Sequence, residues 1–354
     1  MWMKKYSHKD VFHLEEGGTL QGIEIAYHTI GDLNATRDNV IWICHALTGN
    51  AKVEDWWSGL LGIAGPIDTS EYFVVCANVL GSCYGTTGPL SRNELSGEPY
   101  YHDFPFFSIR DIVKAHDLLR EHLNINNVYA GIGGSLGGQQ ILEWSIMKPN
   151  LFERIILIAT NAQHSPWGIA FNESQRMAIE ADVSWLTDEA DAGSNGLKAA
   201  RAAALMSYRN YNAYRLKQSE NDDGKLDLFN ASLYQRYQGD KLASRFNAYS
   251  YYYLSKAMDT HNVGRGRGGV KIALNTVKAK ALIIGVTSDI LFPSSEQVFL
   301  RNHIRDAELK LIDSDFGHDG FLVETAAIGE VVKEFLSPFI EGGGCENLKM
   351  KKYI

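Results

Sequence analysis

The chain has 354 residues, of which 45% are hydrophobic, and its formal net charge is −8. This length and composition fit one enzyme-sized unit with an insertion, and they exclude a disordered or fibrous chain. The negative charge disfavours nonspecific nucleic-acid binding, although a local basic pocket for an anionic substrate stays possible. We therefore expect a soluble enzyme without a nucleic-acid partner.

The cysteines show neither paired C-x-x-C spacing nor the spacing of metal ligands, which favours reduced thiols and predicts no metal site. No apolar run reaches membrane-spanning length, and the start of the sequence lacks the apolar core of a signal peptide. The sequence therefore predicts a cytoplasmic protein that does not bind membranes. The cysteines are Cys44, Cys76, Cys83 and Cys345.

The first part of the chain alternates predicted strands and helices. Residues 23–30 alternate polar and apolar side chains, which predicts a half-buried strand in an antiparallel hairpin at the sheet edge. Residues 40–44 and 72–77 are apolar throughout, as is typical of strands covered on both faces. A long loop of small residues (78–89) and a helix capped by Ser108 follow, so the pattern favours a parallel α/β sheet.

The next segment, residues 127–140, is an apolar run that stops at a serine among glycines and resumes at helical spacing. Gly133-x-Ser135-x-Gly137 matches the nucleophile elbow, a strained strand-to-helix turn that holds a serine hydroxyl above the sheet. The motif predicts Ser135 as the nucleophile.

A glycine-rich turn of this kind could instead bind a dinucleotide, but two residue positions disfavour this. The third glycine of that fingerprint is replaced by Leu136, and the next strand ends in Thr160 and Asn161 rather than in an acidic residue. No phosphate-binding Walker motif is present in the sequence either.

A serine nucleophile also needs two backbone N–H groups that stabilise its oxyanion. One comes from the residue after the serine, here Leu136, and the other from a loop after an early strand. The loop 45–49 follows the strand 40–44, so we predict Leu47 as the second donor. A plain packing role for Leu47 fits the sequence equally well.

The middle of the chain changes character after a strand over residues 154–159. From 163 to 275 no buried strand is predicted, and amphipathic stretches at 196–209 and 234–258 indicate an inserted helical cap. A loop of glycines and arginines (263–269) ends this region. A hinge is the favoured interpretation of that loop, by about two to one over a phosphate-binding nest.

Strands return near the end, at residues 281–286 and 309–312, and each runs into a polar residue with a possible chemical role. Asp289 follows the first strand and His318 follows the second, before a final helix over 321–335.

Ser135, Asp289 and His318 occur in the chain order of the α/β-hydrolase triad. His318 would take the serine proton, and Asp289 would orient the imidazole.

The predicted fold is therefore an α/β-hydrolase fold, a mostly parallel sheet with helices on both faces and an inserted helical cap. The predicted domains are a first part of the core (1–162), the cap (163–275), a second part of the core (276–340) and a C-terminal tail (341–354). The alternative of a noncatalytic binding module is disfavoured because all three triad positions are filled.

Several motifs along nearly the whole chain resemble the homoserine O-acetyltransferase family of the α/β-hydrolase superfamily. The elbow differs from many members in having Leu136 in place of methionine, a change of similar size that leaves the backbone donor intact. The matching motifs are residues 45–49, 78–89, 133–138, 169–173, 238–241, 263–269, 288–289 and 317–322.

The resemblance implies transfer of an acetyl group from acetyl-CoA to L-homoserine in methionine biosynthesis, through an acetyl-serine. It also implies a homodimer whose caps pack together, and no permanently bound cofactor. By the family pattern, Arg209 and Asp319 bind the acceptor. Without the resemblance, Arg209 would be read as a salt-bridge or solvated residue and Asp319 as a helix N-cap. A serine acceptor, a succinyl-CoA donor and ester hydrolysis stay open as alternatives.

Overall fold

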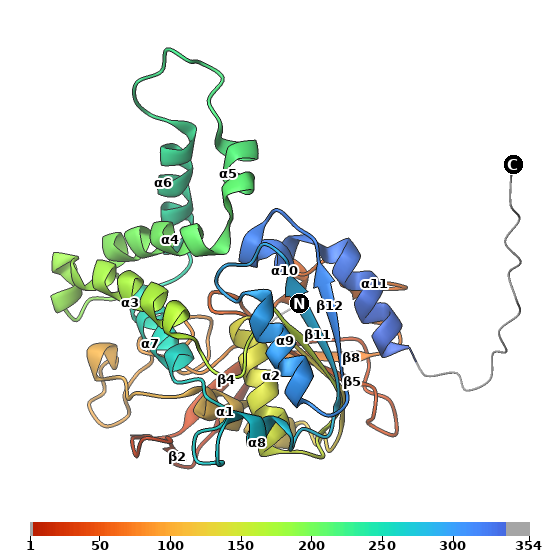
Figure 1. Ribbon diagram of the computed structural model, residues 1–354. Helices are drawn as coiled ribbons and strands as arrows, with labels where there is room; N and C mark the ends of the chain where they lie inside the picture. Colours follow the sequence, from red (N-terminus) through yellow and green to blue (C-terminus); the bar gives the residue numbers. More distant parts are fainter. Residues whose placement is uncertain (1–2, 338–354) are drawn as a thin grey trace, which may run out of the picture.

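The computed structural model describes residues 3–337, and an eight-stranded sheet forms its centre (Figure 1). Six neighbouring strands of this sheet run parallel to one another. The strand β4 (Ile23–Ile30) is antiparallel to both of its neighbours. The predicted α/β-hydrolase fold class is confirmed. In spatial order the strands are β1 (Lys4–His8), β4 (Ile23–Ile30), β8 (Phe73–Ala77), β5 (Val40–Cys44), β9 (Val128–Gly134), β10 (Phe152–Ile158), β11 (Lys280–Val286) and β12 (Ala307–Ile312).

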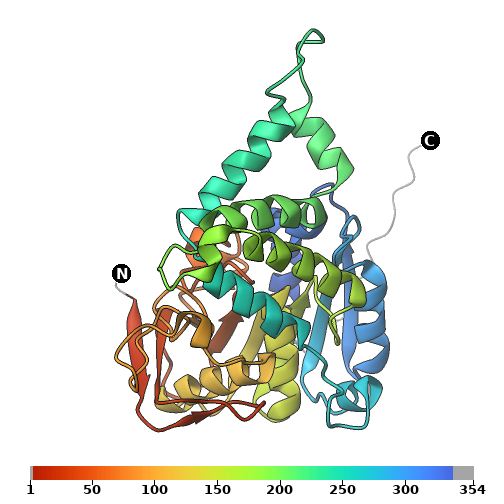
Figure 2. The same ribbon diagram turned by 90° about the vertical axis from the view of Figure 1, so that its left-hand side faces the viewer.

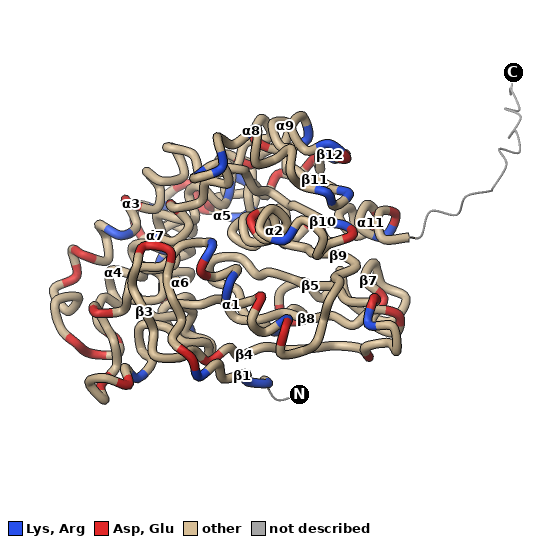
Figure 3. The backbone as a smooth tube through the Cα atoms, turned by 90° about the horizontal axis from the view of Figure 1, so that it is seen from below, with Lys and Arg blue, Asp and Glu red and all other residues tan. Residues whose placement is uncertain are grey.

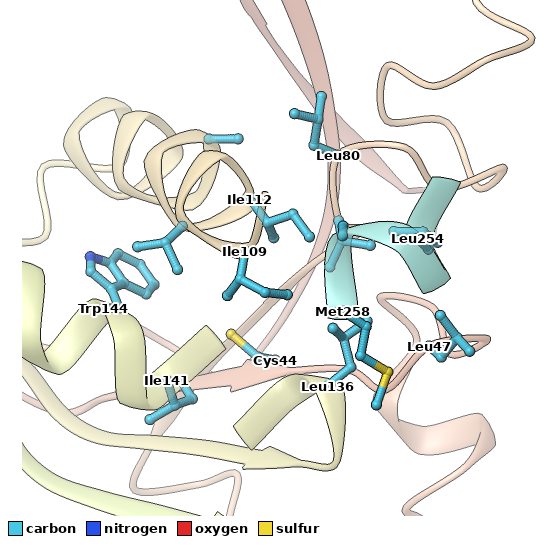
Figure 4. Packing of buried hydrophobic residues seen from close by; sticks show 14 of the residues in the cluster. Cys44, Leu47, Leu80, Ile109, Ile112, Leu136, Ile141, Trp144, Leu254 and Met258 are labelled. Carbon is cyan, nitrogen blue, oxygen red and sulfur yellow. The ribbon is translucent and has the colours of Figure 1, made fainter. Parts of the chain in front are cut away.

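The continuously apolar strands supply two hydrophobic cores, one on each face of the sheet, because successive side chains point to opposite faces. In β5, Val40, Trp42 and Cys44 belong to one core, while Ile41 and Ile43 belong to the other. Figure 4 shows part of the first core, where Trp144 and Ile141 pack beside Ile109 and Ile112. The helices that cover the sheet are α1 (Ile109–His122), α2 (Leu136–Met147), α8 (Val270–Leu274), α9 (Ser294–His303) and α11 (Thr325–Leu336).

Two predicted elements differ from the structure at the ends of the chain. The strand over 23–30 is antiparallel as expected, but it is not an edge strand, because β1 pairs along its outer side. The predicted helix over 321–335 is two helices, α10 (Gly320–Val323) and α11, because Glu324 has a non-helical backbone with ψ of 43°. The predicted C-terminal tail (341–354), with Cys345, lies outside the described residues.

Helices fill the stretch between β10 and β11 that the sequence assigns to the cap. The predicted amphipathic segment 234–258 is divided into two helices, because Asn247 starts a new one by accepting the Ser250 N–H with its side chain. The domain limits themselves stay a prediction. The helices are α3 (Pro166–Glu180), α4 (Ser194–Tyr208), α5 (Tyr211–Gln218), α6 (Asn230–Ala243) and α7 (Ala248–Asp259).

Two of these helices, α5 and α6, project with their connecting loop from the rest of the molecule in both side views (Figures 1 and 2). We call residues 211–243 the arm. It leaves the end of α4, and the stacked helices α3, α4 and α7 lie at its base.

Basic and acidic residues are interspersed along the chain in the view from below (Figure 3). Several of them pair across segments. In the glycine- and arginine-rich loop, Arg265 lies 2.8 Å from Glu15, and Arg267 lies 2.5 Å from Glu143 on α2. Carboxylates of the core thus engage both guanidinium groups. Whether this loop bends as a hinge stays a prediction.

Buried neutral histidines should make the stability depend on pH. Burial lowers the pKa of His45, His116 and His164 to about 4 and that of His261 to about 3, whereas burial raises the pKa of Glu296 to about 7. The histidines' contribution to the free energy of unfolding is fully present above their ordinary pKa of 6.5 and is lost as the pH falls towards 4. The contribution of Glu296 to this pH dependence has the opposite sign, because unfolding releases its proton. Four histidines that take up protons and one glutamate that releases one give a net uptake of roughly three protons on unfolding near pH 5.5.

The free energy of unfolding should therefore rise with pH between about 5 and 6.5, by up to roughly 4 kcal/mol per pH unit. Urea unfolding at several pH values across this range measures the slope. A stability that is flat or falling with pH there would contradict the assignment of these histidines as neutral in the folded state.

Candidate active site

The serine of the predicted elbow lies at the junction of β9 and α2, in a backbone conformation that few non-glycine residues adopt. Ser135 has φ of 56° and ψ of −123°. The turn is tight because its glycines leave no room for side chains: a Cβ on Gly133 would lie 2.2 Å from the Gly137 carbonyl carbon, and one on Gly137 would lie 2.0 Å from Cys44 O. This strain points the hydroxyl out of the sheet.

Two residues far apart in the sequence meet this serine. His318 Nε2 lies 2.9 Å from Ser135 Oγ, and His318 Nδ1 lies 2.7 Å from Asp289 Oδ2. A carboxylate can only accept, so Nδ1 carries the proton and Nε2 accepts the serine hydroxyl. The structure therefore brings the three predicted residues together in the geometry in which an imidazole can take a proton from a serine.

The acid and the histidine are themselves held from several sides. Asp289 Oδ1 accepts the backbone N–H groups of Leu291, at 2.8 Å, and Phe292, at 2.9 Å. The Phe292 ring stacks on the His318 imidazole with centroids 5.0 Å apart. Both polar side chains are buried, so the imidazole has one orientation and one tautomer available.

The two predicted oxyanion donors come from two segments at the active site: Leu47 lies in the loop after β5, and Leu136 is the first residue of α2. Leu47 and Leu136 belong to the same core cluster (Figure 4). Within the described part of the chain, neither backbone N–H donates to a protein acceptor. Both amides are thus available for an oxyanion formed at Ser135, which is what the proposed role requires.

A cavity of about 570 Å³ opens above the serine, between the core and the cap. Ser135, His318 and Leu47 lie at its core side, and residues of α4, α6 and the link to α7 line its cap side. Its charged lining is mainly basic although the whole chain is acidic, which favours an anionic ligand. The charged lining residues are Asp55, Arg201, Arg209, Lys241, Arg245 and Asp319.

The two predicted acceptor-binding residues line this cavity and form an ion pair. Arg209 Nη2 lies 3.1 Å from Asp319 Oδ2, and the two side chains are 23% and 12% exposed. The close approach depends on Gly317, whose Cβ would lie 2.9 Å from the Arg209 carbonyl carbon. Asp319 makes no capping hydrogen bond to α10, so the alternative role as a helix cap is not supported.

Three further cations of the lining had no role in the sequence-based prediction. Arg201 stands over the Tyr208 ring at 5.3 Å, and Arg245 donates to Thr48 O at 2.8 Å. Lys241 belongs to a motif that the family resemblance included without a function. Arg201 lies in α4 and Arg209 follows the last residue of that helix with an extended backbone, so helical spacing in the sequence did not indicate that both face one cavity.

This fold and its Ser-His-Asp constellation define a protein of the α/β-hydrolase class. A family model described as the alpha/beta hydrolase fold matches residues 39–325. A homoserine O-acetyltransferase from Cyclobacterium marinum is 48% identical over 336 residues, covering 95% of both chains. One from Trichormus variabilis is 43% identical over 336 residues, covering 94% of this chain and 93% of the relative. The chain belongs to the homoserine O-acetyltransferase family.

Solved structures with this fold include proteins of two activities. The homoserine O-acetyltransferase from Bacillus anthracis superposes with a TM-score of 0.86 at 27% identity, covering 95% of this chain and 98% of that one. An acetylester hydrolase from Corynebacterium glutamicum gives a TM-score of 0.83 at 25% identity, covering 95% and 96%. The fold is thus shared by a transferase and a hydrolase, and the cavity must distinguish them.

Proposed function

We propose that this protein transfers an acetyl group from acetyl-CoA to the side-chain hydroxyl of L-homoserine, through an acetyl group carried on Ser135. The observation that carries the proposal is one cavity in which the Ser135–His318 hydrogen bond and the Arg209–Asp319 ion pair lie together. The first pair supplies acyl-transfer chemistry, and the second matches an amino acid.

In the first half-reaction, Ser135 Oγ attacks the thioester carbonyl while its proton passes to His318 Nε2. The resulting oxyanion accepts the N–H groups of Leu47 and Leu136. When it collapses, the carbon–sulfur bond breaks and the thiol leaves with the proton from His318. An acetyl-serine remains.

In the second half-reaction, the homoserine hydroxyl gives its proton to His318 and attacks the acetyl carbonyl. A second oxyanion forms in the same place, and Ser135 leaves with the proton that His318 holds. The product is O-acetylhomoserine, an activated intermediate of methionine biosynthesis by the family's role. The same residues act in both half-reactions, because each half-reaction transfers the acetyl group from one nucleophile to another.

The Arg209–Asp319 pair is complementary to the charges of the acceptor. An amino acid carries a carboxylate and an ammonium, and it can lie antiparallel to the pair, with its carboxylate on the free N–H groups of Arg209 and its ammonium on the second oxygen of Asp319. Asp319 follows His318 directly, which places the bound acceptor near the base.

The donor accounts for the remaining positive charge of the cavity. Coenzyme A is polyanionic, and Arg201, Lys241 and Arg245 line the cap side. We assign these three cations to its phosphate groups, because phosphates favour guanidinium and ammonium partners. Succinyl-CoA carries the same phosphates, so these cations fit either donor.

A small matrix of donors and acceptors tests the proposed function. Purified protein is incubated with acetyl-CoA or succinyl-CoA and with homoserine, serine or no acceptor, and both thiol release and the acylated product are followed. We expect acetyl-CoA with homoserine to give the fastest release. Release that is independent of any acceptor would indicate a hydrolase, and faster succinyl transfer or serine acylation would replace the proposed substrates.

We also propose that two copies associate through the arm. The arm has many apolar side chains that are exposed to solvent, and a group of exposed apolar side chains is typical of a protein–protein interface. The exposed apolar residues of the arm are Tyr211 (79%), Leu216 (65%), Leu226 (91%), Leu228 (62%), Phe229 (44%), Leu233 (45%) and Tyr237 (60%).

Placing a charge on the arm should therefore separate the copies. Leu226→Asp combined with Leu228→Asp is expected to turn a dimer into a monomer, because a desolvated unpaired carboxylate is unfavourable at an apolar interface. Sedimentation velocity measures the change. Ile63→Asp, at a residue that is 83% exposed on the core, is the matched control and should remain dimeric. A monomeric wild type, or a dimeric arm variant, would contradict the proposal.

The cytoplasm is the proposed location. Within the described residues, Cys44, Cys76 and Cys83 are free thiols, which fits a reducing compartment. None of the described helices has both the length and the apolar character needed to cross a membrane.

A further inference from the structure

The loop that carries the Leu47 amide begins with a fully buried histidine. His45 is 0% exposed, and its ring makes two hydrogen bonds to backbone atoms. Nδ1 lies 2.8 Å from Ala46 O, and Nε2 lies 3.2 Å from Val79 N. A carbonyl oxygen can only accept and an N–H can only donate, so the ring carries its proton on Nδ1 and leaves Nε2 as an acceptor.

The same carbonyl closes the turn that presents Leu47. Ala46 O accepts the N–H of Gly49 at 2.9 Å in addition to the ring of His45, so both of its lone pairs are used. Through Val79, the ring also joins this turn to the segment that follows β8. His45 thereby fixes the backbone on both sides of the Leu47 amide's position.

The loop at His45 also contacts the nucleophile elbow and the first turns of α2. Gln140, one turn into α2, donates from Nε2 to the backbone carbonyl of His45 at 3.2 Å. A Cβ on Gly137 would lie 3.3 Å from the His45 carbonyl carbon. The loop and the elbow are thus in direct contact, and a shift of the His45 backbone would change the separation of the Leu47 and Leu136 amides.

A general acid or base role for His45 is excluded by its position. The residue does not line the cavity, and the catalytic serine is served by His318. Burial also lowers the pKa of His45 to about 4, so the ring is neutral near pH 7 and keeps the single tautomer that its two partners require.

We propose that His45 is a positioning residue for the oxyanion hole: through Ala46 O and Val79 N it sets the place of the Leu47 amide beside Ser135. The inference rests on the proposed acyl transfer for its assay but not on the identity of the acceptor. Both half-reactions pass through an oxyanion, so both should depend on His45. Substrate binding should depend on it little, because the ring touches neither substrate.

His45→Ala is expected to lower kcat on the order of a hundredfold, the usual effect of losing one oxyanion donor, while KM for donor and acceptor changes by less than about threefold. His45→Gln keeps an acceptor close to the position of Nε2 and should recover at least about a tenth of wild-type kcat. His45→Asn is too short to reach Val79 and retains only a donor towards Ala46 O, so its kcat should fall below that of His45→Gln. His261→Gln, at another buried histidine bonded to a backbone carbonyl, is the control for loss of a buried ring.

Affinity for methylboronic acid, which forms a tetrahedral adduct on a nucleophilic serine, supplies a second measurement. It should fall in parallel with kcat across the His45 variants, because the adduct's oxygen occupies the same hole. If His45→Ala is poorly folded, the comparison of His45→Gln with His45→Asn carries the test. Equal kcat and equal boronate affinity in wild type and in either of the shortened variants would overturn the inference.

The same variants are assayed with para-nitrophenyl acetate, which needs no amino-acid acceptor. A wild type that cleaves this ester but does not acetylate homoserine would contradict the proposed function and still measure the role of His45. A wild type active in both assays, with His45 variants unimpaired in both, would contradict only the inference about His45.

Discussion

Ser135→Ala should abolish acetyl transfer, with a loss of turnover on the order of a millionfold, as for removal of other triad nucleophiles. The serine hydroxyl is the group that His318 Nε2 contacts, at 2.9 Å, and alanine leaves the imidazole without a nucleophile to activate. Thiol release from acetyl-CoA should be lost together with transfer, because both depend on the first half-reaction.

The matched control for this substitution is Ser145→Ala in α2, the helix that begins directly after Ser135. Ser145 is also buried, and its hydroxyl donates to Leu142 O at 2.8 Å. The control should keep activity within a few-fold of wild type. Circular dichroism and thermal unfolding show whether either variant is misfolded. Transfer by a folded Ser135→Ala protein at a rate near that of wild type would exclude an acetyl-serine intermediate.

Arg209→Ala should impair acceptor use while sparing the donor half-reaction. Removing one partner of a buried charged pair costs about 2–5 kcal/mol, which corresponds to a loss of roughly thirty- to several-thousandfold in kcat/KM for homoserine. Acetylation of Ser135 by acetyl-CoA should change little. The acetylated variant should then lose its acetyl group mainly to water, because water needs no carboxylate partner.

The ion pair with Asp319 makes a second variant necessary. Arg209→Ala also leaves a carboxylate that is 12% exposed without its partner, next to His318. Asp319→Asn removes that charge, so the double variant separates the two effects. If the pair were purely structural, the double variant would regain homoserine kinetics; if it binds the acceptor, the double variant should be at least as impaired. Arg215→Ala, at an exposed arginine of α5, is the control and should behave like wild type.

The sequence could predict the elbow because it is a local pattern, and it could predict the triad because its members follow strands in a known chain order. Gly133 and Gly137 are required by backbone contacts within a few residues of Ser135 and by the adjacent end of β5. Asp289 and His318 follow strands at the carboxyl edge of a parallel sheet, where side chains from successive strands meet. Their convergence on one serine thus follows from topology.

The sequence could not predict features that depend on which distant segments meet. The strand Lys4–His8 is too polar and exposed to have a clear apolar pattern, so β4 was predicted at the edge. The helix breaks at Glu324, whose side chain accepts a hydrogen bond at 2.6 Å from Ser314 Oγ, outside the helix. The pairing of Arg209 with Asp319 likewise joins the cap to the core across 110 positions of the numbering, and no local pattern indicates it.

The cations that line the cavity likewise could not be predicted from the sequence. The sequence-based prediction assigned catalytic or binding roles only to residues of recognised family motifs. It assigned no role to Arg201, Lys241 or Arg245. These residues become visible as a group only when α4, α6 and the link to α7 fold over Ser135. A basic cavity in a chain of net charge −8 is therefore a property of the tertiary structure.

The acetyl-enzyme is the species that tests the proposed mechanism most directly. The protein is mixed with acetyl-CoA alone, quenched rapidly and analysed by intact mass and peptide mapping, and a second sample receives homoserine before the quench. We expect one acetyl group on the peptide that contains Ser135, and its rapid loss to O-acetylhomoserine when homoserine is added. An enzyme that makes O-acetylhomoserine at its full rate without ever carrying the acetyl group would contradict double displacement and require direct transfer between bound substrates.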